Sequence, residues 1–561
     1  MLVIENLSIS FGSGTKKVLA TDNISIHLEK GASLGLVGES GSGKSITALA
    51  IMKLLPAQAI IEKGKILFND QNLLQSNIRA IADYRGNKIS MIFQEPMTAL
   101  NPVKRCGKQV AETIIWHQKL GKREARKQVI ELFKKVKLPR PEEMYKAYPH
   151  QISGGQKQRV MIAMAIANKP DLLIADEPTT ALDVTVQNEI LDLLNALKKE
   201  YGMSLLFISH DLGVVARVAD EVAVMYKGKI VETGAVQQVF NFPKHPYTKG
   251  LMACRPPLDV RLKKLPTIDE FLDGNNSLST EDQIESPAER KKIHQKMYAK
   301  EAVLKVEKLF TKYPLKKNFL GKTLTFLNAV DAVSFQVYPG ETLGLVGESG
   351  CGKTTLGRSI LRLIEPDSGN IYFDEKDLLS LSRNSLKKER QHLNIVFQDP
   401  YSSLNPRMSI GQALMEPMQV FGLYGNNRQR KQKVLELLEK VGLKAEHFSR
   451  YPHEFSGGQR QRIVIARALT LQPKFIICDE AVSALDVSVQ AKVLNLLNDL
   501  KKEFGFTYIF ISHDLSVVRF MSDRIMVMKD GKIIESGDAD ELYNHPQNEY
   551  TKQLLAAVAS I

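Results

Sequence analysis

The pattern Gly-x-x-x-x-Gly-Lys-Ser/Thr occurs twice in this chain, once near each end. Glycines permit a tight turn in which successive backbone N–H groups point at one anion, and the following helix adds the positive end of its dipole. The lysine is expected to reach the β- and γ-phosphates of a nucleotide, and the hydroxyl after it to ligate Mg²⁺. The residues expected to contact nucleotide are Gly38, Ser40, Gly41, Gly43, Lys44 and Ser45, and Gly347, Ser349, Gly350, Gly352, Lys353 and Thr354.

The flanks of each loop suit this chemistry. An apolar run, Leu34–Val37 or Leu343–Val346, precedes the loop and predicts a buried strand. A helical pattern follows it, at Ile46–Leu55 and Leu356–Leu363. A Gly-rich turn could arise by chance once, but two copies with nearly identical flanks indicate two nucleotide sites in one polypeptide.

A second apolar run in each copy ends in two adjacent acids, Asp176-Glu177 and Asp479-Glu480. A wholly apolar strand is expected in a parallel sheet, and its carboxyl end opens at the edge where such sheets bind ligands. The two aspartates are predicted to hold Mg²⁺, and the two glutamates to polarise the attacking water as general bases. The alternative is a pair of helix-capping acids, which the upstream phosphate loop makes the weaker interpretation.

Other landmarks recur at a nearly constant offset of about 303 residues, which indicates a duplicated domain. They are a glutamine after an apolar strand, the sequence Ser-Gly-Gly-Gln, and a Ser-His-Asp sequence after a further strand. The candidate site residues among them are Gln94, Ser153, Gly155, Gln156 and His210, and Gln398, Ser456, Gly458, Gln459 and His513. The loop lysines are 309 apart, because the second copy has extra length around Lys316–Thr325.

The chain has 561 residues, 43% of them hydrophobic and 25% charged, which is an ordinary soluble composition with room for two full domains. No apolar run approaches the length of a spanning helix, and no signal peptide is visible at the start. Four cysteines without C-x-x-C spacing are typical of a reduced compartment, without a disulfide framework or metal cluster. The net charge of +14 is compatible with nucleic acid or an anionic membrane face, and equally with scattered solvated lysines.

The polar composition of the region between the copies divides the chain into a first domain at 1–265, a linker at 266–300 and a second domain at 301–561. Within the linker, residues 288–300 could form a short helix.

Taken in order, these motifs resemble the ATP-binding cassette (ABC) ATPases over nearly all of both halves. The resemblance implies an α/β fold with two tandem P-loop NTPase domains. Each would combine a RecA-like parallel-sheet core with an antiparallel β subdomain and an α-helical subdomain. It further implies that Gln94 and Gln398 are the Q-loop glutamines, which also touch Mg²⁺, and that His210 and His513 contact the γ-phosphate.

The resemblance gives roles to further residues. Phe11 and Tyr313 are similar to the aromatic residue that stacks on adenine, although either could be an ordinary strand residue. Asp183 and Asp486 match the D-loop. The two domains are expected to pair head to tail within the chain, so that each Ser-Gly-Gly-Gln signature completes the nucleotide site of the other half. No catalytic residue is missing from either copy, so both sites are expected to hydrolyse ATP.

Further details resemble the dipeptide, oligopeptide and nickel importer branch: Tyr148-Pro149-His150 and Tyr451-Pro452-His453 before the signatures, and His-Pro-Tyr-Thr from His245. The implied function is that of the ATPase subunit of a membrane importer, bound peripherally to the cytoplasmic face of a prokaryotic cell membrane. Its partners would be two permease subunits and an extracytoplasmic solute-binding protein, with no nucleic acid. Peptide is the leading solute; nickel, glutathione, a peptide-like antibiotic or a sugar stay open.

Some members of that branch bind an iron–sulfur cluster through cysteines after His-Pro-Tyr-Thr. Only Cys254 stands there in this chain, so no cluster is expected, and the cofactors are ATP and Mg²⁺. The main alternative function is a soluble fused cassette ATPase acting on ribosomes, but the short linker disfavours it. An export ATPase and a DNA-repair ATPase are further alternatives, the latter disfavoured because no zinc module or long coiled coil interrupts the domains.

Overall fold

The computed structural model describes residues 1–12, 17–94, 99–180, 182–257, 260–274, 283–317, 323–483 and 485–559. The chain divides into two compact units, which are described separately. Of the described residues, the first unit contains those within Met1–Met252 and 268–274, and the second contains those within Ala253–Thr267 and 283–559. Residues 253–257 and 260–265, which the sequence assigns to the first domain, therefore pack with the second copy.

The first unit contains an antiparallel sheet and a mainly parallel sheet. The antiparallel sheet has the order β2-β1-β4-β5. The second sheet has the order β10-β9-β3-β8-β7-β6, and only the β9–β10 pair is antiparallel. The strands are β1 (Leu2–Phe11), β2 (Val18–Leu28), β3 (Ser33–Val37), β4 (Ala59–Phe68), β5 (Gln71–Asn72), β6 (Ile89–Ile92), β7 (Leu172–Asp176), β8 (Ser204–Ser209), β9 (Glu221–Tyr226) and β10 (Lys229–Ala235).

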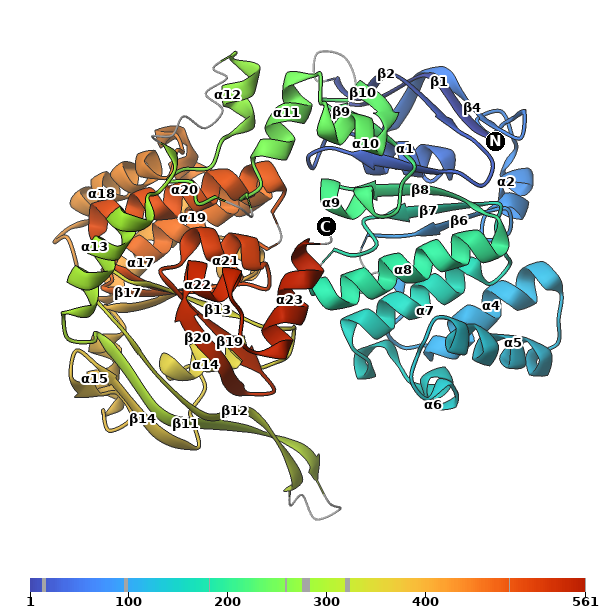
Figure 1. The fold of residues 1–561 in the computed structure, drawn as a ribbon. Coiled ribbons are helices and arrows are strands. Elements are labelled where there is room, and N and C mark those ends of the chain that lie inside the picture. The colour runs from blue at the N-terminus through green and yellow to red at the C-terminus, as the bar shows by residue number, and fades with distance from the viewer. Residues whose placement is uncertain are drawn as a thin grey trace. The chain divides into compact units, whose positions relative to one another are not determined.

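The helices of the first unit begin with the one that follows the phosphate loop. They are α1 (Lys44–Ile51), α2 (Ile78–Tyr84), α4 (Cys106–Gln118), α5 (Lys122–Lys135), α6 (Pro141–Lys146), α7 (Gly154–Ile166), α8 (Val184–Tyr201), α9 (Leu212–Ala216), α10 (Val236–Asn241), α11 (Pro246–Ala253) and α12 (Ile268–Leu272). In Figure 1, strands β6, β7 and β8 lie between the antiparallel sheet and α1 on one side and helices α7 and α8 on the other.

The core of the first unit explains this layering. Every residue of β3, β7 and β8 is buried, as expected for parallel strands covered on both faces. One apolar cluster joins the antiparallel sheet, α1 and the parallel sheet, and includes Leu2, Ile26, Ala48 and Ile174. The loop between β3 and α1 is thereby fixed between two packed layers.

The second unit repeats this arrangement. Its antiparallel sheet has the order β12-β11-β14-β15, and its other sheet the order β16-β17-β18-β13-β19-β20, antiparallel only at β19–β20. The strands are β11 (Leu304–Lys317), β12 (Thr323–Val337), β13 (Thr342–Val346), β14 (Ser368–Phe373), β15 (Lys376–Asp377), β16 (Leu393–Val396), β17 (Phe475–Asp479), β18 (Thr507–Ile511), β19 (Arg524–Lys529) and β20 (Lys532–Asp538).

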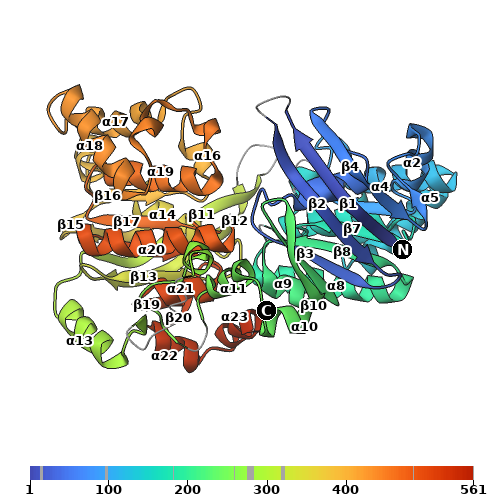
Figure 2. The ribbon, with the colours of Figure 1, turned by 90° about the horizontal axis from the view of Figure 1, so that it is seen from above.

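The helices of the second unit include one from the expected linker. They are α13 (Pro287–Tyr298), α14 (Lys353–Ile360), α15 (Arg383–Glu389), α16 (Pro400–Ser403), α17 (Ile410–Val420), α18 (Asn427–Lys440), α19 (Gly457–Leu469), α20 (Val487–Phe504), α21 (Leu515–Met521), α22 (Ala539–Asn544) and α23 (Glu549–Ala559). Helices α16 to α19 gather at one end of this unit (Figure 2). The helix expected within 288–300 is present as α13, and residues 275–282 of the expected linker lie outside the described residues.

The structure corrects one sequence-based detail and agrees with the position of another. The helices after the phosphate loops begin earlier than expected, at Lys44 and Lys353, and end earlier, because the backbone turns left-handed at Lys53 (φ 54°) and Arg362 (φ 48°). The extra length of the second copy forms the outer part of the β11–β12 hairpin, which projects from its unit (Figure 1). Residues 318–322 of that insertion lie outside the described residues.

Candidate nucleotide-binding and hydrolysis site

Both phosphate loops have a backbone that only glycine accommodates. Gly43 and Gly352 adopt φ values of 105° and 111° just before their helices. A Cβ atom on Gly352 would lie 2.0 Å from the carbonyl oxygen of Ala329, and one on Gly43 would lie 2.5 Å from that of Ala20. Strand β2 in the first copy and strand β12 in the second therefore lie directly against the phosphate loop. This close contact holds the N–H groups of the loop in a fixed arrangement.

The loop lysines are buried and hydrogen-bonded within their own loops. Lys44 Nζ donates to the carbonyl oxygens of Gly38 (2.7 Å) and Glu39 (2.9 Å). Lys353 makes the same pair of bonds in the second copy, to Gly347 at 2.7 Å and to Glu348 at 2.9 Å. Each ammonium group is thus held over the loop that is expected to bind phosphate.

A hydroxyl and a carboxylate converge beside each loop. Ser45 Oγ donates to Asp176 Oδ1 at 3.1 Å, and Thr354 Oγ1 to Asp479 Oδ1 at 2.8 Å. Burial raises the pKa of Asp176 to about 6, helped by the neighbouring charge of Glu177, and burial also raises the pKa of Asp479. A buried carboxylate that is costly to ionise alone is stabilised by a cation, and paired oxygen donors suit a hard divalent ion such as Mg²⁺. These residues fit the expected metal.

The adjacent glutamate of the first copy connects three other groups. One oxygen of Glu177 accepts hydrogen bonds from Gln94 Nε2 (2.9 Å) and Thr180 Oγ1 (3.0 Å). The other lies 3.2 Å from Nδ1 of His210. Burial, the largest single effect, would raise the pKa of Glu177, but the hydrogen bond and charge of His210, the charge of Lys44 and the hydrogen bond from Thr180 together lower it to about 2. The carboxylate is therefore ionised at neutral pH.

The second copy repeats this cluster with a looser contact. Gln398 Nε2 donates to Glu480 at 2.7 Å, whereas His513 Nδ1 lies 3.7 Å away. The pKa of Glu480 is lowered, against the effect of burial, by His513. Both glutamates have a left-handed backbone, with φ 48°. Non-glycine residues rarely adopt this conformation, and it concentrates at functional sites.

The Ser-Gly-Gly-Gln sequences form the first turns of α7 and α19. Ser153 Oγ accepts from the Gln156 N–H at 3.3 Å while Gln156 Oε1 accepts from the Ser153 N–H at 3.0 Å, and Ser456 and Gln459 repeat both distances. Such reciprocal caps leave the other first-turn N–H groups directed out of the helix end. Each Ser-Gly-Gly-Gln sequence lies against the helix that follows the predicted D-loop aspartate of its own unit. A Cβ on Gly458, for example, would lie 2.2 Å from Val489.

The remaining predicted residues occupy distinct places. Phe11 is the half-buried last residue of β1, and Tyr313 is exposed on the β11–β12 hairpin. Asp183 and Asp486 are the residues before α8 and α20, and the Asp183 side chain accepts from the Val186 N–H. The stacking and D-loop roles of these four residues stay predictions. Residues 181 and 484 beside the aspartates lie outside the described residues.

Sequence reasoning missed one pair of residues at the loops. The hydroxyl of Tyr247, from His-Pro-Tyr-Thr, accepts a hydrogen bond from the loop N–H of Glu39 at 3.0 Å. In the second copy Tyr550 accepts from Glu348 at 3.1 Å. The signal was present, because Tyr-Thr recurs at 247 and 550 with the same offset of 303 residues as the catalytic motifs.

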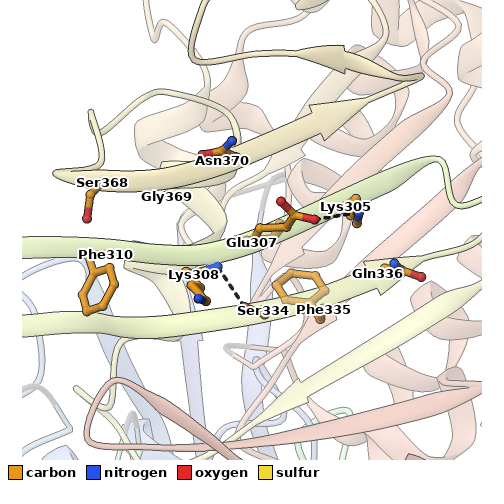
Figure 3. A pocket seen from close by; sticks show the side chains of 11 residues that line it. Lys305, Glu307, Lys308, Phe310, Ser334, Phe335, Gln336, Ser368, Gly369 and Asn370 are labelled. Atoms are coloured by element: carbon orange, nitrogen blue, oxygen red, sulfur yellow. Dashed lines mark hydrogen bonds and ion pairs between the residues drawn. The ribbon is translucent and has the colours of Figure 1, made fainter.

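A depression of about 900 Å³ lies apart from these residues on strands β11, β12 and β14. Figure 3 shows Lys308 between Phe310 and Phe335, two of its lining residues. None of its lining residues is a predicted site residue.

Comparisons with known proteins agree with the duplicated motifs. The family model for "ABC transporter" matches residues 21–180 and 330–483, and that for "Oligopeptide/dipeptide transporter, C-terminal region" matches residues 231–276. The chain is 47% identical to the glutathione import ATP-binding protein GsiA of Escherichia coli K12, over 100% of this chain and 89% of the relative. The protein of the same name from Shigella flexneri is also 47% identical, with the same coverage.

Among solved structures, the dimeric cassette MJ0796 is 28% identical over 42% of this chain and 99% of its own, with a TM-score of 0.39. A post-hydrolysis form of MJ0796 bound to ADP and Pi is 29% identical over 42% of this chain and 98% of its own, with a TM-score of 0.38. Within the described residues, no helix is long and apolar enough to cross a membrane.

Proposed function

Because the chain belongs to the ABC transporter family, we propose that its two copies are the paired ATPase sites of an importer for glutathione or a related short peptide. The protein is an importer-type ATPase that binds and hydrolyses ATP. The identity of the solute is what we propose. It is supported by 47% identity to a glutathione import protein over 100% of this chain and 89% of the relative. The matched oligopeptide transporter region at 231–276 favours peptide-type solutes and leaves the ribosomal alternative without support.

We assign the catalytic steps to the two glutamate clusters. Glu177 and Glu480 would each take a proton from the water that attacks the γ-phosphate, which Lys44 or Lys353 holds. While His210 contacts Glu177, it lowers the basicity of the carboxylate. A histidine that turns to the γ-phosphate would remove that charge, and burial would then raise the pKa of the glutamate. Phosphate binding and activation of the base are coupled in this way.

Mg²⁺ would be held by Ser45, Asp176 and Gln94 in the first copy and by Thr354, Asp479 and Gln398 in the second. Bound there, the ion would neutralise charge on the β- and γ-phosphate oxygens. The convergence of hydroxyl and carboxylate oxygens in both copies supports this assignment.

The two copies are proposed to pair head to tail within one chain, each site borrowing the other's signature. Closure and hydrolysis would then be coupled, and opening and closing would move the permeases. One composite site would contain Lys44, Gln94, Glu177, His210, Ser456 and Gly458, and the other Lys353, Gln398, Glu480, His513, Ser153 and Gly155.

The partners are proposed to be two permease chains and a solute-binding protein, with the ATPase on the cytoplasmic face of the membrane. The test is affinity purification of the tagged chain from membranes, followed by reconstitution in vesicles. We expect two permeases to co-purify and glutathione with its binding protein to stimulate ATP hydrolysis. Co-purification of ribosomal subunits would overturn the importer assignment, and stimulation by another solute alone would overturn glutathione.

A further inference from the structure

Two parts of the segment that connects the two copies, one before α12 and one after it, are built into the second unit. Residues 253–257 and 260–267 belong to that unit, and so does α13. Leu265 and Asn495 of α20 bond reciprocally: the Leu265 N–H donates to Asn495 Oδ1 at 2.9 Å, and Asn495 Nδ2 donates to the Leu265 carbonyl at 2.8 Å. We call residues 260–267 with α13 the connecting strap.

Two arginines of the connecting strap bind the carboxyl end of α21. Arg261 donates from its two terminal nitrogens to the carbonyl oxygens of Arg519 (2.6 Å) and Ser522 (2.8 Å). Arg290 donates to the carbonyl oxygen of Asp523 at 2.8 Å and pairs with the carboxylate of Asp540. The last carbonyls of a helix have no partner within it, so these guanidinium groups act as its cap.

The capped helix follows the proposed γ-phosphate contact directly. His513 is followed by Asp514, whose side chain accepts from the N–H groups of Ser516 and Val517 at the start of α21. A seven-residue helix therefore joins His513 to the carbonyls that the strap holds. At the strap end, Asp523 also accepts from the Thr342 N–H at 2.8 Å, at the start of the strand that leads to the phosphate loop.

The first copy serves as an internal comparison, because the end of its α9 has a different donor: Asn195 Nδ2 donates to the Arg217 carbonyl at 3.0 Å. Its α9 contains five residues rather than seven. At the offset of 303 residues, Asp538 and Asp540, which pair with Arg290, are replaced by Ala235 and Gln237, so these two acids are specific to the second copy. Asn495, which both donates and accepts, is replaced by Asp192. An aspartate cannot donate in this way when ionised.

We propose that Arg261 and Arg290 are positioning residues for the second ATP site, holding His513 beside Glu480 through α21. The geometry makes hydrolysis at the second copy depend on docking of the segment that arrives from the first. The two sites of one chain are therefore unequal, although their catalytic residues are the same. This inference rests on the proposed roles of Glu480 and His513.

The test compares Arg261→Ala with wild type in the full chain, by ATP hydrolysis and by amide hydrogen exchange. Exchange is expected to accelerate in α21 and not in α9, its matched control. The value of kcat is expected to fall by about twofold, because one of two sites is lost, and it should fall further if the two sites act together. The KM for ATP is expected to stay unchanged. Arg261→Lys keeps one donor group and is expected to recover part of kcat. Lys263→Ala, an exposed strap residue paired with Glu289, is expected to change neither quantity.

Unchanged exchange in α21 would overturn the cap, and faster exchange with unchanged kcat would overturn the positioning role. Equal acceleration of hydrogen exchange in α9 and α21, with a lower melting temperature, would show a general loss of stability and would also overturn the positioning role. His513→Ala separates this inference from its premise. If that variant leaves kcat unchanged, the proposed catalytic assignment fails, whereas the exchange result still judges the cap.

Discussion

Nδ1 of His210 lies 3.2 Å from a carboxylate oxygen of Glu177, closer than the 3.7 Å between His513 and Glu480. The two catalytic clusters of this chain are therefore alike in composition and unequal in contact. The tighter contact accompanies a third donor, Thr180, on the Glu177 carboxylate, whereas Ser483 donates to the backbone carbonyl of Glu480. Substitutions at the two glutamates can test both the shared role and the inequality.

Glu177→Gln and Glu480→Gln are each expected to slow hydrolysis at their own site. An amide keeps the shape of the side chain but cannot take the proton, and loss of a general base typically costs about 10²–10⁴ in rate. Steady-state ATPase assays of the full chain should show a loss in each single variant and the least activity in the double variant. ATP affinity should be retained, since the phosphate loops are unchanged.

Glu200→Gln is the matched control for these substitutions, because Glu200 is exposed and pairs only at the surface with Lys135. It is expected to leave the rate unchanged. Full activity in Glu177→Gln would show that the first site has another base.

Tyr247→Phe and Tyr550→Phe are expected to weaken ATP binding. Each removes the hydroxyl that accepts a loop N–H while keeping a buried ring, and Tyr247 also stacks on Tyr226 with a centroid distance of 4.2 Å. One hydrogen bond contributes about 1 kcal/mol, so we expect roughly a fivefold rise in the dissociation constant at the altered loop. Titration with a fluorescent ATP analogue measures it. Tyr201→Phe, at an exposed contact with Lys135, is the control, and equal affinity in all three variants would contradict the role.

Two glycines of the second loop should respond differently to alanine. Gly350 has φ 84° with open space around it, so Gly350→Ala meets only the left-handed backbone cost of about 1–2 kcal/mol. Gly352→Ala meets the same kind of cost and also places a Cβ 2.0 Å from the Ala329 carbonyl oxygen. Thermal unfolding should show a clearly larger loss for Gly352→Ala. A similar loss for both would mean that the strand beside the loop yields easily.

Much of the fold and site could be predicted from the sequence because the motifs occur twice. The α/β class with two tandem cassette domains is confirmed, and the predicted loop, acid, glutamine and histidine residues come together within each unit. Apolar runs such as Leu172–Ala175 predict buried strands directly, since a parallel strand buries both faces.

The sequence could not show which copy the connecting segment packs against. Arg261 and Arg290 resemble ordinary surface arginines in a polar stretch, and each donates to backbone carbonyls more than 230 residues away. Backbone partners leave no trace in side-chain patterns. For Tyr247 the repeat of Tyr-Thr at 247 and 550 marked the residue, but it could not show that the partner is the backbone N–H of Glu39.

The absence of an iron–sulfur cluster stays a prediction. Cys254 is buried just after α11, and among the described residues no group of three or more His, Cys, Asp or Glu is placed to hold a metal ion. Anaerobically purified protein is expected to be colourless, with no absorbance band in the visible region. A band that disappears in Cys254→Ser would contradict this.

Stability of the second unit is expected to fall at alkaline pH through His294. Its two ring nitrogens lie 3.3 Å from Asp523 and 3.4 Å from Asp538. Hydrogen bonds to these acids raise the pKa of His294 from 6.5 to about 9, against the opposing effects of burial and the charge of Arg290. Because the folded state holds the proton more tightly, this contribution is complete below pH 6.5 and is lost as pH rises through 9.

The measurement is the melting temperature of the full chain between pH 6 and 10, in wild type and His294→Gln. Glutamine keeps hydrogen bonds but carries no charge, so the variant is expected to be less stable at neutral pH and to approach wild type above pH 9. His27→Gln, at an exposed position of β2, is expected to follow the wild-type curve. A His294→Gln curve that runs parallel to wild type throughout this range would show that the imidazolium does not fasten α13 to the second copy.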